Sequence, residues 1–329
     1  MRRERQVRYS GDDGHCVFLV IGSEPPGRRA AVQGRPGPPG VLLVRPSFVN
    51  YNDMMHISLL KVTAFFYLAG SLLYLYFIIT LNERGARLGR MSLLIGVLLH
   101  ATGFVLRYAA AGYTPVTNLF ESLSFFALAI AGTFLVVEIR YNLRTLGSFV
   151  APLAFVFSIF AAFLPGEVAG LAPALNSYWL PIHVMLLFIG DAVFAVAFGA
   201  GIMYLLQEKQ VKRKKMGAMF KRLPSLDVLD DINYRCLTIG FPLLTLGIIT
   251  GSIWAEYAWG SYWSWDPKET WSLITWLLYA ALLHGRLTVG WRGRKAAILA
   301  IVGFGAVLFT FLGVNLLLPG LHSYSSLSR

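Results

Sequence analysis

The chain has 329 residues, of which 56% are hydrophobic and only 14% are charged. A soluble domain of ordinary composition carries about 25% charged residues, and the interior of a protein this size is too small to hide so much apolar surface from water. The composition excludes an ordinary soluble domain and indicates that lipid is the main solvent. The net charge of +12 therefore matters less than the positions of the basic residues.

Residues 1–53 differ in composition from the rest of the chain. They contain eight Arg, five acidic residues and a cluster of prolines between Pro25 and Pro39. Such a composition is typical of a disordered basic tail. A second hypothesis is that the natural start is Met54 or Met55, because an apolar helix is predicted to begin at Ile57. Both hypotheses divide the chain into residues 1–53 and a membrane domain, residues 54–329.

Eight apolar segments follow, each long enough to cross a hydrocarbon core of about 30 Å as a helix. They cover residues 57–81, 91–111, 119–138, 146–164, 182–207, 236–257, 267–285 and 296–318. The sequence predicts an all-α integral membrane protein with about eight transmembrane helices. Most connections are short, and residues 208–235 are predicted as one long polar loop.

The basic residues predict the orientation. Four loops, residues 82–90, 139–147, 208–235 and 286–295, contain 17 Lys and Arg, whereas the alternate loops contain none and the tail after residue 318 has only Arg329. Basic loops face the cytoplasm in membrane proteins. We expect the N- and C-termini of the membrane domain to lie on the outer face.

The most informative segment is the tryptophan loop, residues 254–271. It contains five Trp and two Tyr in 18 residues, and the charge pattern places it on the outer face. An aromatic belt at the headgroup level explains one or two Trp at each helix end. It does not explain Trp259, Trp263 and Trp265 in one short loop. The crowding favours a site for a flat apolar ligand or a dry lid.

The end of this loop has the pattern of a helix start. Asp266 is predicted as the N-cap, with Pro267 at the first helical position and Glu269 at the third. An anionic group can bind at such a helix end. The alternative is that Asp266 and Glu269 only cap the helix.

Two histidines are predicted at the same membrane face as the tryptophan loop. His183 begins the fifth apolar segment, and His322 follows the eighth. A single interfacial histidine is usually an amphipathic filler. Two that flank an aromatic loop can supply both axial ligands of a haem iron, since imidazole with its ordinary pKa of about 6.5 is largely neutral near pH 7.

Other polar residues lie inside or at the ends of the apolar segments. His284 is 17 residues after Pro267, about 25 Å along the helix and so near the cytoplasmic side. His100 and Asp191 lie near mid-membrane, where ionisable groups are costly and suggest function. For His100 the alternative is a packed, hydrogen-bonded core residue. Asp191 is either a structural partner to a helix hydroxyl or part of a polar path. Arg107 can pair with Glu121 or with a ligand carboxylate, and an ion pair is the simpler interpretation.

The run from Trp259 to Trp276, W-G-S-Y-W-S-W-D-P-K-E-T-W-S-L-I-T-W, and the following His284 resemble the tryptophan-rich WWD signature of the CcsA/ResC cytochrome c assembly proteins of System II. The run P-V-T-N-L-F-E-S, residues 115–122, resembles the second signature of that family. The resemblance covers about residues 57–329, and residues 1–53 depart from the family pattern.

The resemblance implies a site for haem b on the outer face. The haem would lie on the tryptophan loop, with His183 and His322 as axial ligands of its iron. His284 matches the family's membrane histidine, which is thought to receive haem on its way. The remaining cofactor-binding positions carried over from the signature are Trp259, Trp263, Trp265, Asp266 and Trp271. Neither the resemblance nor the residues point to a catalytic acid or base.

The resemblance also implies partners and a reaction. A CcsB/ResB-like membrane subunit would complete the inner haem site, and the pair would support thioether attachment of haem to the C-x-x-C-H thiols of apocytochrome c. The chain itself has two Cys, Cys16 and Cys236, and no C-x-x-C pair, so it is not a c-type cytochrome. We expect no nucleic-acid partner. The bacterial cytoplasmic membrane is favoured over the thylakoid membrane.

Two alternatives remain open. The first is a haem transporter or chaperone of the CcmC type, which presents haem without attaching it. The second is an unrelated secondary transporter, which would be built from two matched halves with interrupted helices. The sequence contains no such symmetry.

Overall fold

The computed structural model describes residues 51–168, 170–214 and 217–320. All of them belong to the unit Asn50–Arg329, whereas the other unit, Met1–Val49, and with it the interpretation of the N-terminal tail, lie outside the described residues. The described residues form helices and loops, with no strand among them. The predicted all-α class is confirmed.

The helices follow the eight predicted apolar segments, and their bounds extend beyond most of them. They are α1 (Tyr51–Thr80), α2 (Glu83–Ala111), α3 (Leu119–Tyr141), α4 (Gly147–Phe163), α5 (Trp179–Lys212), α7 (Leu226–Trp259), α8 (Pro267–Thr288) and α9 (Arg294–Leu308), which continues through a π-helical turn (Phe309–Gly313) into α10 (Val314–Leu317). Seven segments are long and apolar enough to cross a membrane. The eighth predicted span, α8, is present but is rich in Trp, Ser, Thr and charged residues.

The predicted long polar loop, residues 208–235, is mostly helical, which corrects that prediction. Helix α5 continues to Lys212, the short helix α6 covers Ala218–Arg222, and α7 already begins at Leu226. The side chain of Ser225 caps α7 by accepting from the backbone N–H of Val228. The apolar segments end where the sequence becomes polar, but the helices continue. A helix that leaves the bilayer no longer needs an apolar surface.

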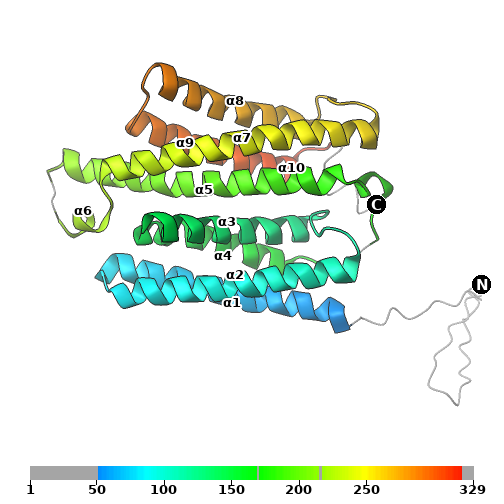
Figure 1. The fold of residues 1–329 in the computed structure, drawn as a ribbon, viewed down its shortest axis with the longest axis horizontal. Helices are drawn as coiled ribbons and strands as arrows, with labels where there is room; N and C mark the ends of the chain where they lie inside the picture. Colours follow the sequence, from blue (N-terminus) through cyan, green and yellow to red (C-terminus); the bar gives the residue numbers. More distant parts are fainter. Residues whose placement is uncertain (1–50, 169, 215–216, 321–329) are drawn as a thin grey trace, which may run out of the picture. The chain divides into compact units, whose positions relative to one another are not determined.

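Helix α5 lies at the centre of the described unit. Figure 1 shows α1 to α4 on one side of it and α7 to α9 on the other. Small residues let α5 and α7 approach closely: a Cβ added to Gly190 would lie 3.3 Å from the carbonyl oxygen of Gly240. In a membrane, lipid tails are as apolar as the side chains, so burial of apolar surface does not drive helix association. Close packing at small residues contributes instead. Farther along α5, the Phe194 and Tyr279 rings stack with centroids 3.6 Å apart.

Large apolar side chains also cover the outer surface of the bundle. Phe65, Ile79 and Val136 are each more than 60% exposed, as expected for side chains that contact lipid tails. Two ends of the bundle result. Residues 112–118, 164–168, 170–178, 260–266 and 318–320 form one end, which the positive-inside pattern places outside, and the basic turns form the other. The protein is a multi-pass membrane protein.

Candidate functional site

The tryptophan loop is held by its helix cap. Asp266 accepts a hydrogen bond from the backbone N–H of Lys268 at 3.0 Å, and Glu269 accepts from the backbone N–H of Asp266 at 3.2 Å, so the predicted capping box is present. Glu269 also accepts from the backbone N–H of Ser264 at 2.7 Å. The same carboxylate thus fixes both the first turn of α8 and the loop before it.

His183 lies in the second turn of α5 with its ring against α7. Its Nδ1 lies 2.7 Å from the carbonyl oxygen of Gly247. A carbonyl oxygen only accepts, so Nδ1 carries the proton and the neutral ring has its lone pair on Nε2. The ring packs on Gly251, where an added Cβ would collide with Nδ1 and Cε1. Gly251 therefore makes room for the imidazole, and Gly247, four residues earlier, accepts its hydrogen bond.

Two adjoining cavities lie at the outer end of α5. The larger has a volume of about 180 Å³ and the smaller about 70 Å³. His183, Leu187, Lys268, Ser272 and Thr310 line both of them. The larger cavity is mostly apolar and extends from α8 to the loop before α3; the smaller lies under Trp263. His183 therefore places an imidazole on the wall that the two cavities share. Ligand pockets are usually apolar with a few polar groups at fixed positions, and this site has that composition.

The predicted tryptophans divide into three groups. Trp259 lines the larger cavity together with Trp254, whose ring stacks on that of His183 with centroids 6.2 Å apart. Trp263 lines the smaller cavity and contacts Trp265 edge to face at 5.7 Å. Trp265 is 70% exposed and has a left-handed φ of 58°. Trp271 packs on a phenylalanine of the π-helical turn instead.

The second predicted axial ligand, His322, lies outside the described residues. The last described residue, Gly320, packs against the helix cap: an added Cβ would collide with Asp266 and lie 3.3 Å from Cδ of Pro267. The main chain therefore reaches the tryptophan loop two residues before His322.

The π-helical turn shapes the cavity wall. Its residues Thr310 and Phe311 line the larger cavity, and Thr310 lies 3.1 Å from the hydroxyl of Thr275 on α8. A π-turn rotates all following residues relative to a continuous α-helix and often occurs at functional sites. Beyond it, the buried Asn315 accepts a hydrogen bond from Nζ of Lys268 at 3.3 Å. The sequence analysis missed Asn315, since no motif marks a π-turn.

Asp191 lies deeper on the same face of α5. His183, Leu187 and Asp191 follow one another at intervals of four residues and all line the larger cavity. At 1.5 Å per residue, Asp191 lies about 12 Å along the helix from His183. Asp191 therefore lines the larger cavity about two helical turns inward from His183.

A buried ion pair holds the outer loops that complete the larger cavity. Nη2 of Arg107 lies 2.8 Å from Oε1 of Glu121, which confirms the predicted ion pair. Nη1 of Arg107 donates to the carbonyl oxygen of Gly166 at 2.6 Å. Glu121 in turn accepts from the backbone and the hydroxyl of Thr117, a residue that lines the cavity. Burial, reinforced by the charge of Glu121, raises the pKa of Tyr113 in the same loop. The network therefore positions a cavity wall.

Two other described histidines, His56 and His100, are buried in this half of the bundle. His100 is 2% exposed and lies 3.2 Å from the hydroxyl of Tyr67 and 2.8 Å from that of Ser124. The hydrogen-bonded core interpretation of His100 is confirmed. His56 lies 2.6 Å from Nη1 of Arg107, a contact that sequence reasoning did not anticipate because the two residues are 51 positions apart.

His284 lies far from the outer cavities, near the inner end of α8. Its side chain is exposed, on a stripe with Ile274, Leu277 and Ala281. These residues recur at intervals of three and four, so they share one face of the helix. This face is turned away from the bundle.

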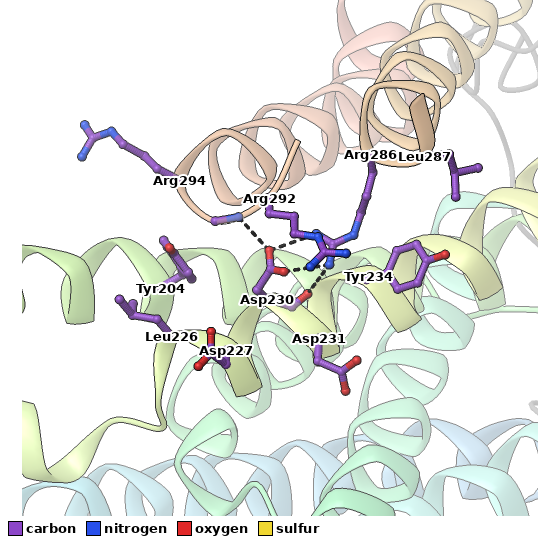
Figure 2. A pocket seen from close by; sticks show the side chains of 11 residues that line it. Tyr204, Leu226, Asp227, Asp230, Asp231, Tyr234, Arg286, Leu287, Arg292 and Arg294 are labelled. Atoms are coloured by element: carbon purple, nitrogen blue, oxygen red, sulfur yellow. Dashed lines mark hydrogen bonds and ion pairs between the residues drawn. The ribbon is translucent and has the colours of Figure 1, made fainter. Parts of the chain in front are cut away.

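A polar concavity of about 770 Å³ lies at the inner end of the bundle. Its lining includes Arg286, two residues after His284. Figure 2 shows its central contact: Arg286 donates two hydrogen bonds to Asp230, at 2.9 and 2.7 Å, and the backbone N–H of Gly293 donates to the same carboxylate. Arg286 also lies 4.5 Å from the ring centroid of Tyr234. These contacts join α7, α8 and the start of α9.

Within the described ranges, no three His, Cys, Asp or Glu side chains are placed to hold a metal ion together. Iron that brings its own porphyrin needs only axial ligands from the protein. The outer site combines an imidazole whose Nδ1 is hydrogen-bonded to a backbone carbonyl with apolar walls and indole rings at the rim. His183, Trp254, Trp259 and Trp263 are brought together, whereas Trp265 and Trp271 do not line the described cavities.

Comparison with known proteins agrees with this description. Residues 116–322 match the family described as cytochrome C assembly protein. The chain is 41% identical over 253 residues to the cytochrome c biogenesis protein CcsA of Chlamydomonas reinhardtii, with 75% of this chain and 70% of that protein covered. It is 40% identical to CcsA of Synechococcus elongatus, with 72% and 87% covered.

The fold is also similar to a solved structure. The cytochrome c haem lyase CcmF superposes with a TM-score of 0.60 at 19% sequence identity, over 79% of this chain and 47% of the lyase. The chain thus spans about half the length of that lyase. At this level of identity the likeness concerns the fold.

Proposed function

Because this chain belongs to the cytochrome c assembly protein family, we propose that its outer cavity binds haem b and presents it for attachment to apocytochrome c. The observation that carries the proposal is the position of His183. Its ring forms the shared wall of two cavities under the tryptophan loop, and its hydrogen bond to Gly247 leaves the lone pair on Nε2. A backbone carbonyl that fixes the tautomer in this way is the common arrangement for metal-binding histidine.

His322 supplies the second axial ligand in this proposal. The contact of Gly320 with the cap of α8 supports it, because two residues span at most about 7 Å. The larger cavity, about 180 Å³, is smaller than the roughly 300–1,000 Å³ of typical ligand sites, so the porphyrin enters when the outer loops move apart. Asp266 contributes through the cap that holds the loop.

His284 belongs to a separate inner site. It lies on the exposed stripe of α8, so a second ligand has to come from another chain. We assign that ligand to a CcsB/ResB-like membrane subunit that packs on the stripe. Haem would pass from this site on the inner half of the membrane to the outer cavity. The positive-inside pattern then places the outer cavity on the extracytoplasmic side of a bacterial cytoplasmic membrane.

The reaction at the outer cavity is thioether formation. Each thiol of an apocytochrome C-x-x-C-H segment adds across one vinyl group: a C–S bond forms, and the thiol proton ends on the neighbouring vinyl carbon. No electrons are gained or lost overall. The described residues contribute binding and orientation, which bring thiol and vinyl groups together at high effective concentration. The vinyl groups themselves are supplied by the haem.

The test begins with the visible spectrum of haem that co-purifies with the full chain. His183→Ala and His322→Ala each remove one axial imidazole, so we expect an altered spectrum in both variants and partial restoration by added imidazole. Unchanged spectra in both variants would reject the outer site. Imidazole restores the ligand without refolding the protein and is thus the internal control.

A second step separates attachment from presentation. The chain is reconstituted with a ResB-like subunit and an apocytochrome, and covalent haem is measured by its pyridine haemochrome spectrum after acid extraction. Thioether-linked haem supports the lyase function. Bound haem that never becomes covalent would instead establish the CcmC-type alternative, presentation without ligation.

A further inference from the structure

A basic concavity lies at the inner end of the bundle, where the last turns of α5 meet the first turn of α9. Its volume is about 410 Å³. The two helices approach closely there: a Cβ added to Gly201 would lie 2.9 Å from the carbonyl oxygen of Ala297. The lining consists of two leucines and four cationic side chains: Leu205, Leu206, Lys209, Lys212, Arg213 and Arg294. Two distant segments of the chain therefore bring their positive charges to one space.

One carboxylate offsets part of this charge. Glu208 pairs with Lys212 at 2.7 Å and with Arg294 at 2.8 Å. Lys209 and Arg213 are exposed, and neither forms an ion pair within the part of the chain that the structure describes. The carbonyl groups at the end of α5 add a partial negative charge equivalent to about half an elementary charge. The basic concavity therefore keeps a net positive charge.

The aspartates of the neighbouring polar concavity do not supply the missing negative charge. Asp230 is paired with Arg286, and Asp231 is paired with Arg235. Neither aspartate lines the basic concavity. Arg294 borders both concavities, and Figure 2 shows its side chain turned away from these aspartates. An anion from outside the chain is therefore the missing partner of the basic concavity.

The basic concavity lies at the depth of the lipid headgroups. The apolar segments of α5 and α9 cover residues 182–207 and 296–318, so the cations directly adjoin the apolar surface. Ile298 and Val302 are 39% and 49% exposed. They follow Arg294 at intervals of four residues and therefore share its face of α9. An acyl chain can lie on this apolar face while its headgroup reaches the cations.

We propose that the basic concavity binds the headgroup of one anionic phospholipid of the inner leaflet. The phosphate pairs with Lys209 and Arg213, and the acyl chains lie along the exposed face of α9. Basic pockets between transmembrane helices are known to bind such headgroups. A free phosphate ion satisfies the same cations but gains nothing from the apolar surface beside them. The bound lipid thus joins the end of α5 to the start of α9.

The test measures lipid binding to the purified full chain by native mass spectrometry, with phosphatidylglycerol and phosphatidylcholine of identical acyl chains. Each basic side chain near an anionic headgroup contributes about a fivefold preference, so Lys209 and Arg213 together should give about a 25-fold preference for phosphatidylglycerol. The double variant Lys209→Gln and Arg213→Gln should lose most of this preference. The double variant Lys209→Arg and Arg213→Lys keeps both charges and should retain it.

The matched control is the double variant Arg84→Gln and Arg87→Gln. Both arginines are exposed at the inner end of α2, and neither lines the basic concavity. The control removes the same charge from the same end of the bundle, so it should leave the preference unchanged. An equal loss in the control would assign the preference to general surface charge and overturn the proposal. Equal wild-type affinity for the two lipids would also overturn it. Displacement of phosphatidylglycerol by an equal concentration of inorganic phosphate would assign the site to a soluble ion instead.

Discussion

Replacing Gly251 with alanine tests the outer site without touching a ligand. The added Cβ would occupy the space of the His183 ring, overlapping Nδ1 and Cε1 and lying 3.3 Å from Cγ. The ring cannot slide along α7 to avoid it, because Nδ1 is tied to the carbonyl oxygen of Gly247. We expect the imidazole to rotate away from the shared cavity wall.

The energetic cost is modest, so the variant should fold. An extra methyl group in a packed site costs about 1–3 kcal/mol, and loss of the Gly247 hydrogen bond adds about 0.5–1.5 kcal/mol. Replacing a helical glycine with alanine offsets up to about 1 kcal/mol. With the full offset, the net destabilisation is about 0.5–3.5 kcal/mol. The effect on the haem spectrum should be as large as that of His183→Ala, because the imidazole no longer reaches the cavity.

The assay is the visible spectrum of co-purified haem, with thermal unfolding in detergent as a second readout. Gly132→Ala and Gly305→Ala are the controls: both are helical glycines with nothing within 4 Å of an added Cβ, so both should leave the spectrum unchanged. Added imidazole should restore Gly251→Ala less than His183→Ala, because the new methyl group and the displaced ring occupy the site. A wild-type spectrum for Gly251→Ala would show that the fixed ring of His183 is not an iron ligand.

Three further predictions concern other parts of the molecule. Trp263→Ala should lower haem retention in correctly inserted protein, and Trp265→Ala should lower it less, because Trp265 is 70% exposed; normal haem content in both would favour a simple aromatic belt. His284→Ala should reduce haem delivered to the outer face in the complex with its partner but leave binding of externally added haem unchanged, and a wild-type load would remove its role. Arg107→Ala leaves the buried carboxylate of Glu121 uncompensated and should destabilise the protein by about 3–5 kcal/mol in thermal unfolding, whereas a double replacement by leucine should recover much of this.

The sequence was sufficient for features that depend on near neighbours. The capping box could be predicted because Asp266 and Glu269 are only three positions apart. The helices could be predicted from continuous apolar segments, because lipid offers the backbone no hydrogen-bond partner outside the helix. The Arg107–Glu121 pair was also predictable, because a short turn brings their two helices together.

The sequence was insufficient where contacts join distant segments or where the helix period changes. The contact between His56 and Arg107 joins two helices in a way that composition does not indicate. The π-helical turn adds a residue to one turn without any marker in the sequence, so the pairing of Asn315 with Lys268 could not be anticipated. The sequence analysis missed the extension of α5 and α7 beyond the membrane, because hydropathy identifies segments that contact lipid and not helices that continue into water.

The composition of α8 has a consequence for biogenesis. This helix carries the tryptophan cap and His284, and it is the one predicted span whose apolarity falls below that of the other seven. A translocon partitions segments by their hydrophobicity, so α8 is a weak candidate for insertion as it leaves the ribosome. Its stable neighbours, α7 before it and the strongly apolar α9 after it, have to draw it into the bilayer as a hairpin. Insertion of α8 is therefore completed only after α9 has been made.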